Sequence, residues 1–304
     1  MSHGTLPMMV LSCFVLAISA SRSLAQDSTA QDSTAQDSTQ TARTFTTVDV
    51  PGATHTEANG VDRNGDIVGF FVDSKGVEHG FKDVAGKFST INFPGSTGTR
   101  AYGIDLNGGD IVGTFTDSTF TPHGFLLVNG KFTRINVPGA AWTRALGVNS
   151  FGSIVGAYAD RAGVVHGFLD KNNLGTFTTL DFPGAVLTEV HSVVNLRYMA
   201  GIFVDSSSVE HGVQGASGML TFAVNVPGAG FTSADGVNDA VNIVGHFGAS
   251  AAGRFQGYFL SGGQFQTIDF PGATDTRCNG VTDNLEIVGS YTDTKGVVHG
   301  FSAK

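Results

Sequence analysis

Short apolar runs, separated by turns rich in glycine, asparagine and aspartate, follow one another along most of this chain. In their first clear copy the runs are Thr56–Val61, Ile67–Phe71, Val77–Phe81 and Lys87–Phe93. Their length and their content of Phe, Val, Ile and Thr are typical of β-strands, and the intervening residues are those that tight turns need. The second run is apolar throughout, which indicates a strand covered on both faces.

The same group of four runs is repeated along the chain at a fixed period. The last copy of its most regular stretch is Thr267–Thr276, TIDFPGATDT, and the proline of this stretch recurs every 43 to 45 residues. The prolines are Pro51, Pro94, Pro138, Pro183, Pro227 and Pro271. Four short strands in about 44 residues are the signature of a propeller blade. We therefore predict an all-β fold, a six-bladed β-propeller with four antiparallel strands per blade.

The two ends of the repeat region hold incomplete blades that complement each other. The region starts on a fourth-strand segment, Phe45–Val50, and ends on a third-strand segment, Val297–Phe301. We expect the N-terminal strand to pair with the C-terminal blade, which closes the ring and removes an open sheet edge. An open β-solenoid is the alternative, but it would not need matching half-blades at its ends.

The residues before the repeats divide into a targeting segment and a spacer. Pro7–Ala20 is an apolar run too short to span a bilayer, and Ser23-Leu24-Ala25 fits a cleavage signal, so residues 1–25 are predicted to be a signal peptide. Residues 26–43 are built on repeats of QDSTA and are predicted to be a disordered low-complexity linker. The propeller then spans residues 44–304. We expect a protein that is secreted or located in the periplasm or cell envelope, with no transmembrane segment.

Composition and charge narrow the range of partners. The formal net charge of −9 disfavours a general nucleic-acid role. The chain has no glycine-rich phosphate loop opening a helix and no metal-ligand motif, so no cofactor and no metal are expected. Without the signal peptide Cys278 is the only cysteine, which excludes an intramolecular disulfide; its repeat equivalents are small apolar residues, and we interpret it as part of the core. We expect a monomer.

The repeat resembles a known family. The pattern IVGxYxDxxGxxHGF followed by GxFTTIDFPGA is similar to the bacterial probable extracellular repeat family called HAF, and the similarity extends over all six copies. It implies a secreted or envelope protein and no settled activity. The fourth and fifth copies depart most from the pattern; in the fifth, Gln256-Gly257-Tyr258 replaces His-Gly-Phe.

Five copies contain a histidine six residues after an aspartate. The pairs are Asp73 and His79, Asp117 and His123, Asp160 and His166, Asp205 and His211, and Asp293 and His299. A metal ring or a set of catalytic dyads is one interpretation. The fifth copy lacks both partners, having Ala249 and Gln256 instead, and this joint loss favours a contact that stabilises a hairpin.

Candidate binding residues are those that differ between copies of an otherwise constant strand. If the strand TxAxGVN is innermost, its variable positions line one mouth of the central channel, a usual place for recognition. We predict that the ligand-binding residues are Glu57, Arg100, Tyr102, Trp142, Arg144, Glu189, His191 and Arg277. Guanidinium groups suit carboxylates and stacked sugars, and Trp142 is a candidate stacking platform. The alternative is a ring of salt bridges without a ligand, from Arg277 to Glu57 to Arg100 and from Arg144 to Glu189.

No motif identifies this chain as an enzyme, and we assign no catalytic residue. The function that the pattern favours is an extracellular binding or scaffolding module for a glycan, a small anion or a protein. The alternative is a propeller hydrolase or lyase acting on a carbohydrate or lactone. Arginines beside a Tyr and a Glu are similar to the inventory of six-bladed sialidases, but the S-x-D-x-G-x-T-W boxes of those enzymes are absent.

Overall fold

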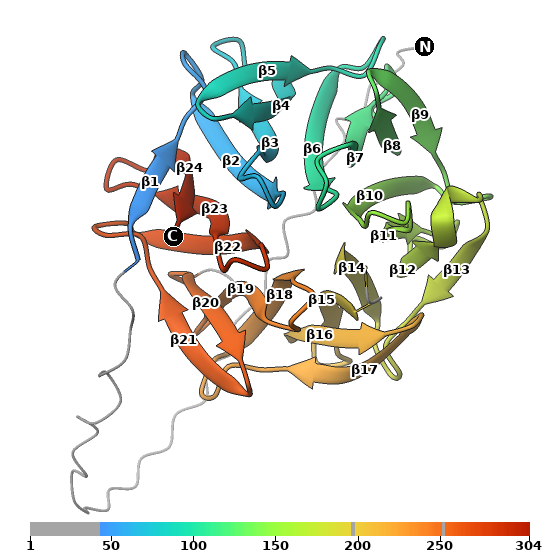
Figure 1. The fold of residues 1–304 in the computed structure, drawn as a ribbon. Helices are drawn as coiled ribbons and strands as arrows, with labels where there is room; N and C mark the ends of the chain where they lie inside the picture. Colours follow the sequence, from blue (N-terminus) through green and yellow to red (C-terminus); the bar gives the residue numbers. More distant parts are fainter. Residues whose placement is uncertain (1–42, 196–197, 251–252) are drawn as a thin grey trace, which may run out of the picture. The chain divides into compact units, whose positions relative to one another are not determined.

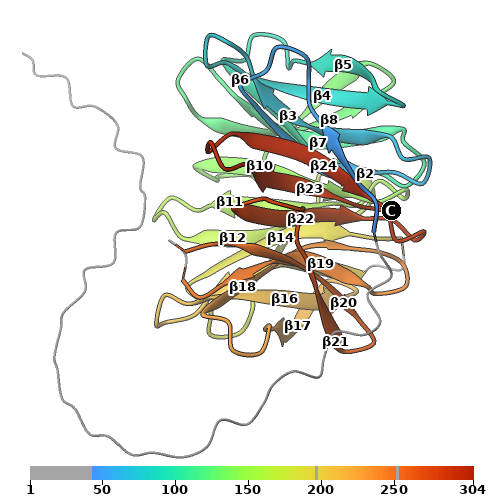
Figure 2. The same ribbon diagram turned by 90° about the vertical axis from the view of Figure 1, so that its left-hand side faces the viewer.

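The computed structural model describes residues 43–195, 198–250 and 253–304. The predicted signal peptide and residues 26–42 of the predicted linker lie outside the described residues. The described part forms six four-stranded antiparallel sheets arranged around a central axis, which confirms the predicted six-bladed propeller (Figure 1). Figure 2 shows the same ring of blades from the side. No helix among these residues is long and apolar enough to cross a bilayer.

Each blade runs from an innermost to an outermost strand. Blade 1 is β2 (His55–Val61), β3 (Ile67–Val72), β4 (Glu78–Val84) and β5 (Lys87–Ile91); blade 2 is β6 (Gly98–Ile104), β7 (Asp110–Thr116), β8 (Pro122–Val128) and β9 (Lys131–Ile135); blade 3 is β10 (Trp142–Val148), β11 (Ile154–Ala159), β12 (Val165–Asp170) and β13 (Phe177–Leu180), with the 3-10 turn η1 (Lys171–Asn173) before β13. Blade 4 is β14 (Leu187–Val193), β15 (Tyr198–Val204), β16 (Glu210–Ala216) and β17 (Met219–Val224); blade 5 is β18 (Phe231–Val237), β19 (Ile243–Gly248), β20 (Gln256–Ser261) and β21 (Gln264–Ile268); blade 6 is β22 (Asp275–Val281), β23 (Ile287–Thr292), β24 (Val298–Ala303) and β1 (Phe45–Val48).

The ring closes as the sequence predicts. Strand β1 pairs antiparallel with β24, with Phe45 opposite Ala303 and Val48 opposite Gly300. The ring of Phe45 also packs against Phe270 and Phe301, at centroid distances of 5.5 and 5.8 Å. The N-terminal strand therefore supplies the outer edge of the last blade.

The hydrophobic core lies between neighbouring blades rather than at one centre. In one such layer Val112 of blade 2 packs with Ala145, Val148 and Phe168 of blade 3. The phenylalanine of the His-Gly-Phe motif is fully buried in four blades. Cys278 is fully buried as well, and this burial raises the pKa of its thiol. The interpretation of Cys278 as a core residue is therefore confirmed.

The Asp–His pairs fix hairpins, as predicted. In blade 1, His79 Nε2 lies 3.4 Å from Asp73 Oδ2, its Nδ1 lies 2.9 Å from Asn92 Oδ1, and its ring stacks on Phe71. Each histidine thus connects the turn after the second strand to the Asn or Asp that lies two positions before a repeat proline. In blade 5 the Gln256 amide donates to Asp269 instead, at 3.1 Å. The five histidines lie in five separate blades, and together they form no single site.

A bulge in every innermost strand turns one side chain towards the axis. The register of β14 shifts between Val190 and Ser192, and that of β18 shifts between Ala234 and Gly236. The residue between each pair has no partner across the sheet, and bulges commonly redirect such side chains. Equivalent shifts occur in the other four blades. The bulge residues are Asn59, Tyr102, Leu146, His191, Asp235 and Asn279.

Directly after the bulge, glycines allow the innermost strands to approach one another. A Cβ atom on Gly147 would lie 2.7 Å from the carbonyl oxygen of His191, and one on Gly103 would lie 2.9 Å from that of Leu146. Such contacts are too short for any side chain. These glycines therefore set the narrow bore of the channel below the bulge residues.

Candidate functional site

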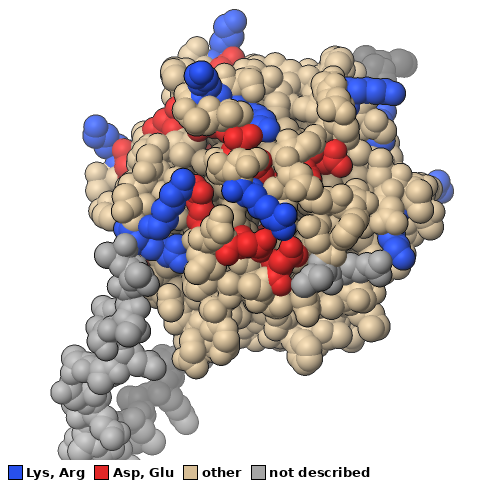
Figure 3. Space-filling view, viewed as in Figure 1, with Lys and Arg blue, Asp and Glu red and all other residues tan. Residues whose placement is uncertain are grey.

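A cavity of about 350 Å³ lies on the axis of the propeller, on the side of the bulge residues where the innermost strands begin. We call it the central cavity. It is lined by Glu57, Asn59, Tyr102, Arg144, Leu146, Glu189, His191, Ile202, Glu210, Ser233, Asp235, His246, Arg277 and Asn279. Acidic and basic side chains lie next to each other near the centre of the face seen in Figure 3. The cavity is therefore polar and of mixed charge.

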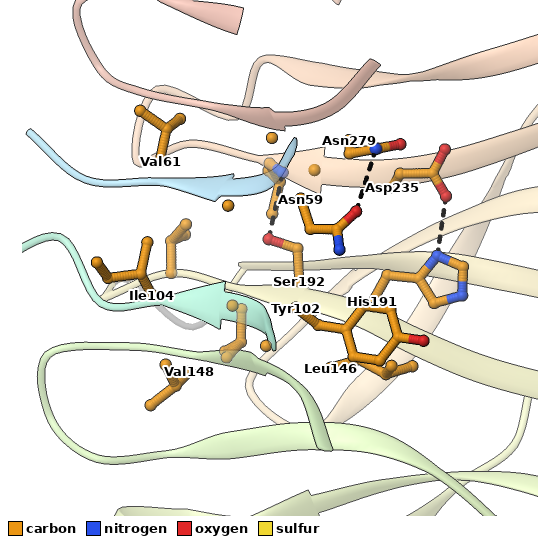
Figure 4. Close-up of a pocket in the computed structure, with 18 of the residues that line it drawn as sticks. Asn59, Val61, Tyr102, Ile104, Leu146, Val148, His191, Ser192, Asp235 and Asn279 are labelled. Carbon is orange, nitrogen blue, oxygen red and sulfur yellow. Dashed lines mark hydrogen bonds and ion pairs between the residues drawn. The ribbon is translucent and has the colours of Figure 1, made fainter. Parts of the chain in front are cut away.

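Beyond the bulge residues the channel narrows to a second cavity of about 70 Å³. Figure 4 shows Tyr102, His191 and Asp235 at one end of this space, whereas Val61, Ile104 and Val148 lie at the other. The bulge residues therefore form the floor of the central cavity, with apolar residues behind them.

Six of the eight predicted site residues line the central cavity. They are Glu57, Tyr102, Arg144, Glu189, His191 and Arg277. In five of the six innermost strands, positions that face the axis and are at least partly exposed alternate with buried positions; in β18 the first four residues are all buried. The structure thus brings together side chains that are far apart in the sequence.

Arg100 and Trp142 lie outside this lining. Arg100 forms a two-point contact with the Glu78 carboxylate, with its Nε 2.7 Å from Glu78 Oε2, and its guanidinium lies over the Phe70 ring at 4.3 Å. Trp142 is half-buried under the guanidinium of Arg144, at 4.7 Å. Two nitrogens of Arg100 are thus engaged by Glu78, and Arg144 covers one face of the Trp142 ring.

The residues named in the alternative ring of salt bridges form no direct ion pairs with each other in the described part of the chain, although the charge of Arg144 helps to lower the pKa of Glu189. Arg100 pairs with Glu78 rather than with Glu57, and Glu57 lies 2.8 Å from His55 Nε2. Neither Arg144 nor Arg277 forms an ion pair or hydrogen bond within the part of the chain that the structure describes; each stacks on an aromatic ring instead.

Blades 4 and 5 contribute a continuous polar network. His191 Nδ1 lies 2.9 Å from Asp235 Oδ1, and His246 Nδ1 lies 2.8 Å from Asp235 Oδ2. The Ser233 hydroxyl donates to Asp235 at 2.7 Å, and His191 Nε2 lies 3.5 Å from Glu189 Oε2. One carboxylate therefore holds two imidazole rings at the wall of the cavity.

This network determines the charges of its members. Burial opposes a charge on His191, but hydrogen bonds to Asp235 and Glu189 outweigh it and raise the pKa of His191 to about 10. Burial likewise acts against the ionised form of Asp235, yet the two histidines hold its pKa well below the usual range. His191 is consequently an imidazolium at neutral pH, between two carboxylates. Among the described residues, no group of three or more His, Cys, Asp or Glu side chains is arranged to hold a metal ion.

Four residues that line the cavity were not among the ligand-binding residues predicted from the sequence: Ser233, Asp235, His246 and Glu210. A signal for His246 was present: it follows the Ile-Val-Gly motif, at a position where the other copies have Phe70, Thr114, Ala157, Ile202 and Ser290. Glu210 lines the cavity without a hydrogen bond or ion pair to any described residue, and burial raises the pKa of its carboxyl group.

Comparisons with known proteins show the fold. The sequence matches no family model and no curated protein. Among solved structures, a TolB from Agrobacterium tumefaciens matches with a TM-score of 0.56 at 11% identity, over 81% of this chain and 89% of that one. A fungal lectin from Aleuria aurantia, described as a six-bladed β-propeller with a novel fucose recognition mode, matches with a TM-score of 0.52 at 12% identity, over 84% and 93%. The propeller domain of the Trilobed protease from Pyrococcus furiosus matches with a TM-score of 0.53 at 7% identity, over 83% and 93%. The structure of this chain is thus similar to those of several propellers.

Proposed function

We propose that this protein is an exported binding module and that its central cavity takes a glycan. The observation that carries the proposal is a cavity of about 350 Å³ whose wall differs from blade to blade. Its size lies within the range of small-ligand sites, roughly 300–1,000 Å³. Export and the HAF-type repeat, which rest on the sequence pattern, are parts of the same proposal.

The chemistry of the wall supports a polyhydroxylated ligand. Sugar hydroxyls both donate and accept hydrogen bonds, and the wall offers carboxylates such as Glu189, cationic donors such as Arg277, and amides such as Asn279. Tyr102 adds an aromatic ring on which a less polar sugar face can rest. The Aleuria aurantia lectin, whose description names fucose recognition, supports the idea that this architecture accommodates a sugar.

The test is a glycan array with the chain that begins at Gln26, followed by calorimetric titration of each ligand found. Leu146→Trp places a large side chain in the cavity from a bulge position, so we expect it to abolish binding. The control is Leu174→Trp, at a side chain that is 72% exposed in the loop before β13. The proposal fails if no glycan binds, or if the parent and Leu146→Trp bind equally.

A hydrolase is the second candidate, because two carboxyl groups of the cavity differ in their ionisation. Burial raises the pKa of Glu210, whereas hydrogen bonding to His191 outweighs burial and lowers that of Glu189. Carboxyls with pKa values pushed apart are the usual pattern of an acid and a base. Turnover of a glycoside or lactone, lost in Glu210→Gln, would support catalysis; binding without turnover across such a panel would exclude it for those substrates.

A further inference from the structure

The charged side chains of the central cavity differ in whether another side chain pairs with them. Glu57 contacts His55 at 2.8 Å, and Glu189 and Asp235 both contact His191. Asp235 also holds His246. Three of the four carboxyl groups that line the cavity are therefore partnered by imidazole nitrogens.

The two arginines of the cavity are different. Arg144 and Arg277 form no ion pair and no hydrogen bond with any residue that the structure describes. Their guanidinium donors are thus free to bind a ligand. Arg100, at the same repeat position, has its donors engaged by Glu78.

Aromatic rings hold both free guanidinium groups in place. Arg144 lies over Trp142 at 4.7 Å, and Arg277 lies over Phe255 at 4.5 Å. Stacking uses the face of the guanidinium plane and leaves its N–H edge available. An arginine held in this way loses less side-chain entropy when it binds.

The fold places these two arginines on opposite sides of the axis. Arg144 is on β10 of the third blade and Arg277 is on β22 of the sixth, which face each other across the ring (Figure 1). Both occupy the position two residues before the bulge, so both lie at the same level of the cavity wall. A ligand on the axis therefore lies between them.

We propose that Arg144 and Arg277 form an anion clamp and that the glycan bound in the central cavity is acidic, with a carboxylate group. This inference rests on the proposed binding function and names the class of ligand. A guanidinium group presents parallel N–H donors that match the two oxygens of a carboxylate. Blade 4 lies on the arc of the ring between the two arginines, and its Glu189 and Glu210 then accept the hydroxyl groups of the same sugar.

The test compares each acid with its neutral form. Oligomers of galacturonate, glucuronate and mannuronate are titrated calorimetrically beside their methyl esters, which keep the hydroxyls and remove the charge. We expect at least one acid to bind about tenfold or more tightly than its ester, with an affinity that falls as salt rises. Arg144→Gln and Arg277→Gln should each weaken binding of the acid by about tenfold or more and leave binding of the ester unchanged.

Arg100→Gln is the matched control, since this arginine has the same repeat position but lies outside the cavity lining; it should bind the acid as the parent does. Equal affinity for acid and ester, with both lost in Leu146→Trp, would overturn the clamp while the proposed binding function stands. Preference for sulfated over carboxylated sugars would also overturn it. If neither form binds and the array is empty, the binding function itself fails.

Discussion

Removing the N-terminal strand should open the propeller and destabilise it strongly. The change is a chain that begins at Pro51, compared with one that begins at Gln26 and keeps β1. The loss can be worked out from the contacts of β1. Val48 is 7% exposed, and burying such a side chain contributes roughly 1.5–3 kcal/mol. The ring of Phe45 packs on Phe270 and Phe301 and should contribute a similar amount.

The backbone pairing of β1 adds to this. Four residue pairs join β1 to β24, and Thr44 and Lys304 exchange two further hydrogen bonds at 2.8 and 3.1 Å. An antiparallel ladder has two hydrogen bonds at every second residue pair, so at about 1 kcal/mol net for each bond the backbone contributes roughly 6 kcal/mol and the whole strand roughly 9–12 kcal/mol. That is comparable to the total stability of an ordinary domain, about 5–15 kcal/mol.

The assay is thermal and urea unfolding followed by circular dichroism. We expect the shortened chain to melt at least roughly 10 °C lower, or not to fold, because about 1 kcal/mol shifts the melting temperature of a chain of this size by some 2–4 °C. Val48→Ala in the longer chain should cost roughly 1–3 kcal/mol, whereas Thr46→Ala, at an exposed position of the same strand, should cost little. Melting of the two chains within a few degrees of each other would refute closure as a source of stability.

Two further predictions concern the ring around the axis. Gly147→Ala should destabilise the fold by roughly 2 kcal/mol or more, because its Cβ would lie 2.7 Å from a backbone oxygen. The control is Gly98→Ala, whose Cβ would have its nearest neighbour at 3.6 Å. Equal urea midpoints for the two variants would contradict the close approach of the innermost strands. The raised pKa of His191 should make stability depend on pH: its contribution is complete below about pH 6.5 and is lost as the pH rises through about 10. The free energy of unfolding of the parent, measured with urea, should therefore fall over this range relative to that of His191→Gln, by on the order of 2–4 kcal/mol. Parallel pH profiles for the two proteins would show that His191 is not held as a cation.

The fold could be predicted because each blade repeats the same sequence pattern of strand and turn residues. The spacing from Pro51 to Pro94 is nearly the same as every later one, so strand number, turn positions and closure follow from the periodicity. The ion-pair partner of Arg100, in contrast, could not be predicted from the periodicity. Its partner Glu78 is 22 residues earlier, on the second-outermost strand of the preceding blade, and only the packing of two blades brings them together.

The contact made by the Trp142 ring could not be predicted from the sequence either. Trp142 is the only tryptophan of the chain and lies at the start of an innermost strand, which made it a candidate stacking platform. However, the guanidinium of Arg144, two residues later on the same face, lies over its ring. Strand alternation places these two side chains side by side, although it does not say which one faces the ligand. The sequence therefore identified the wall of the cavity better than the part played by each residue in it.

The bulge positions explain how a symmetric scaffold acquires an asymmetric site. Successive blades present different residues at the same point of the backbone, and some of these residues form hydrogen bonds with the bulge residue of the neighbouring blade. His191 is joined to Asp235, and the Asn279 amide donates to Asn59 at 3.3 Å (Figure 4). These two pairs use polar groups that would otherwise face the cavity. Tyr102 and Leu146, from the remaining two blades, then form the less polar part of the floor. The floor of the central cavity consequently has one apolar side and one charged side, and the proposed sugar would be oriented by this difference without any change in the six blades themselves.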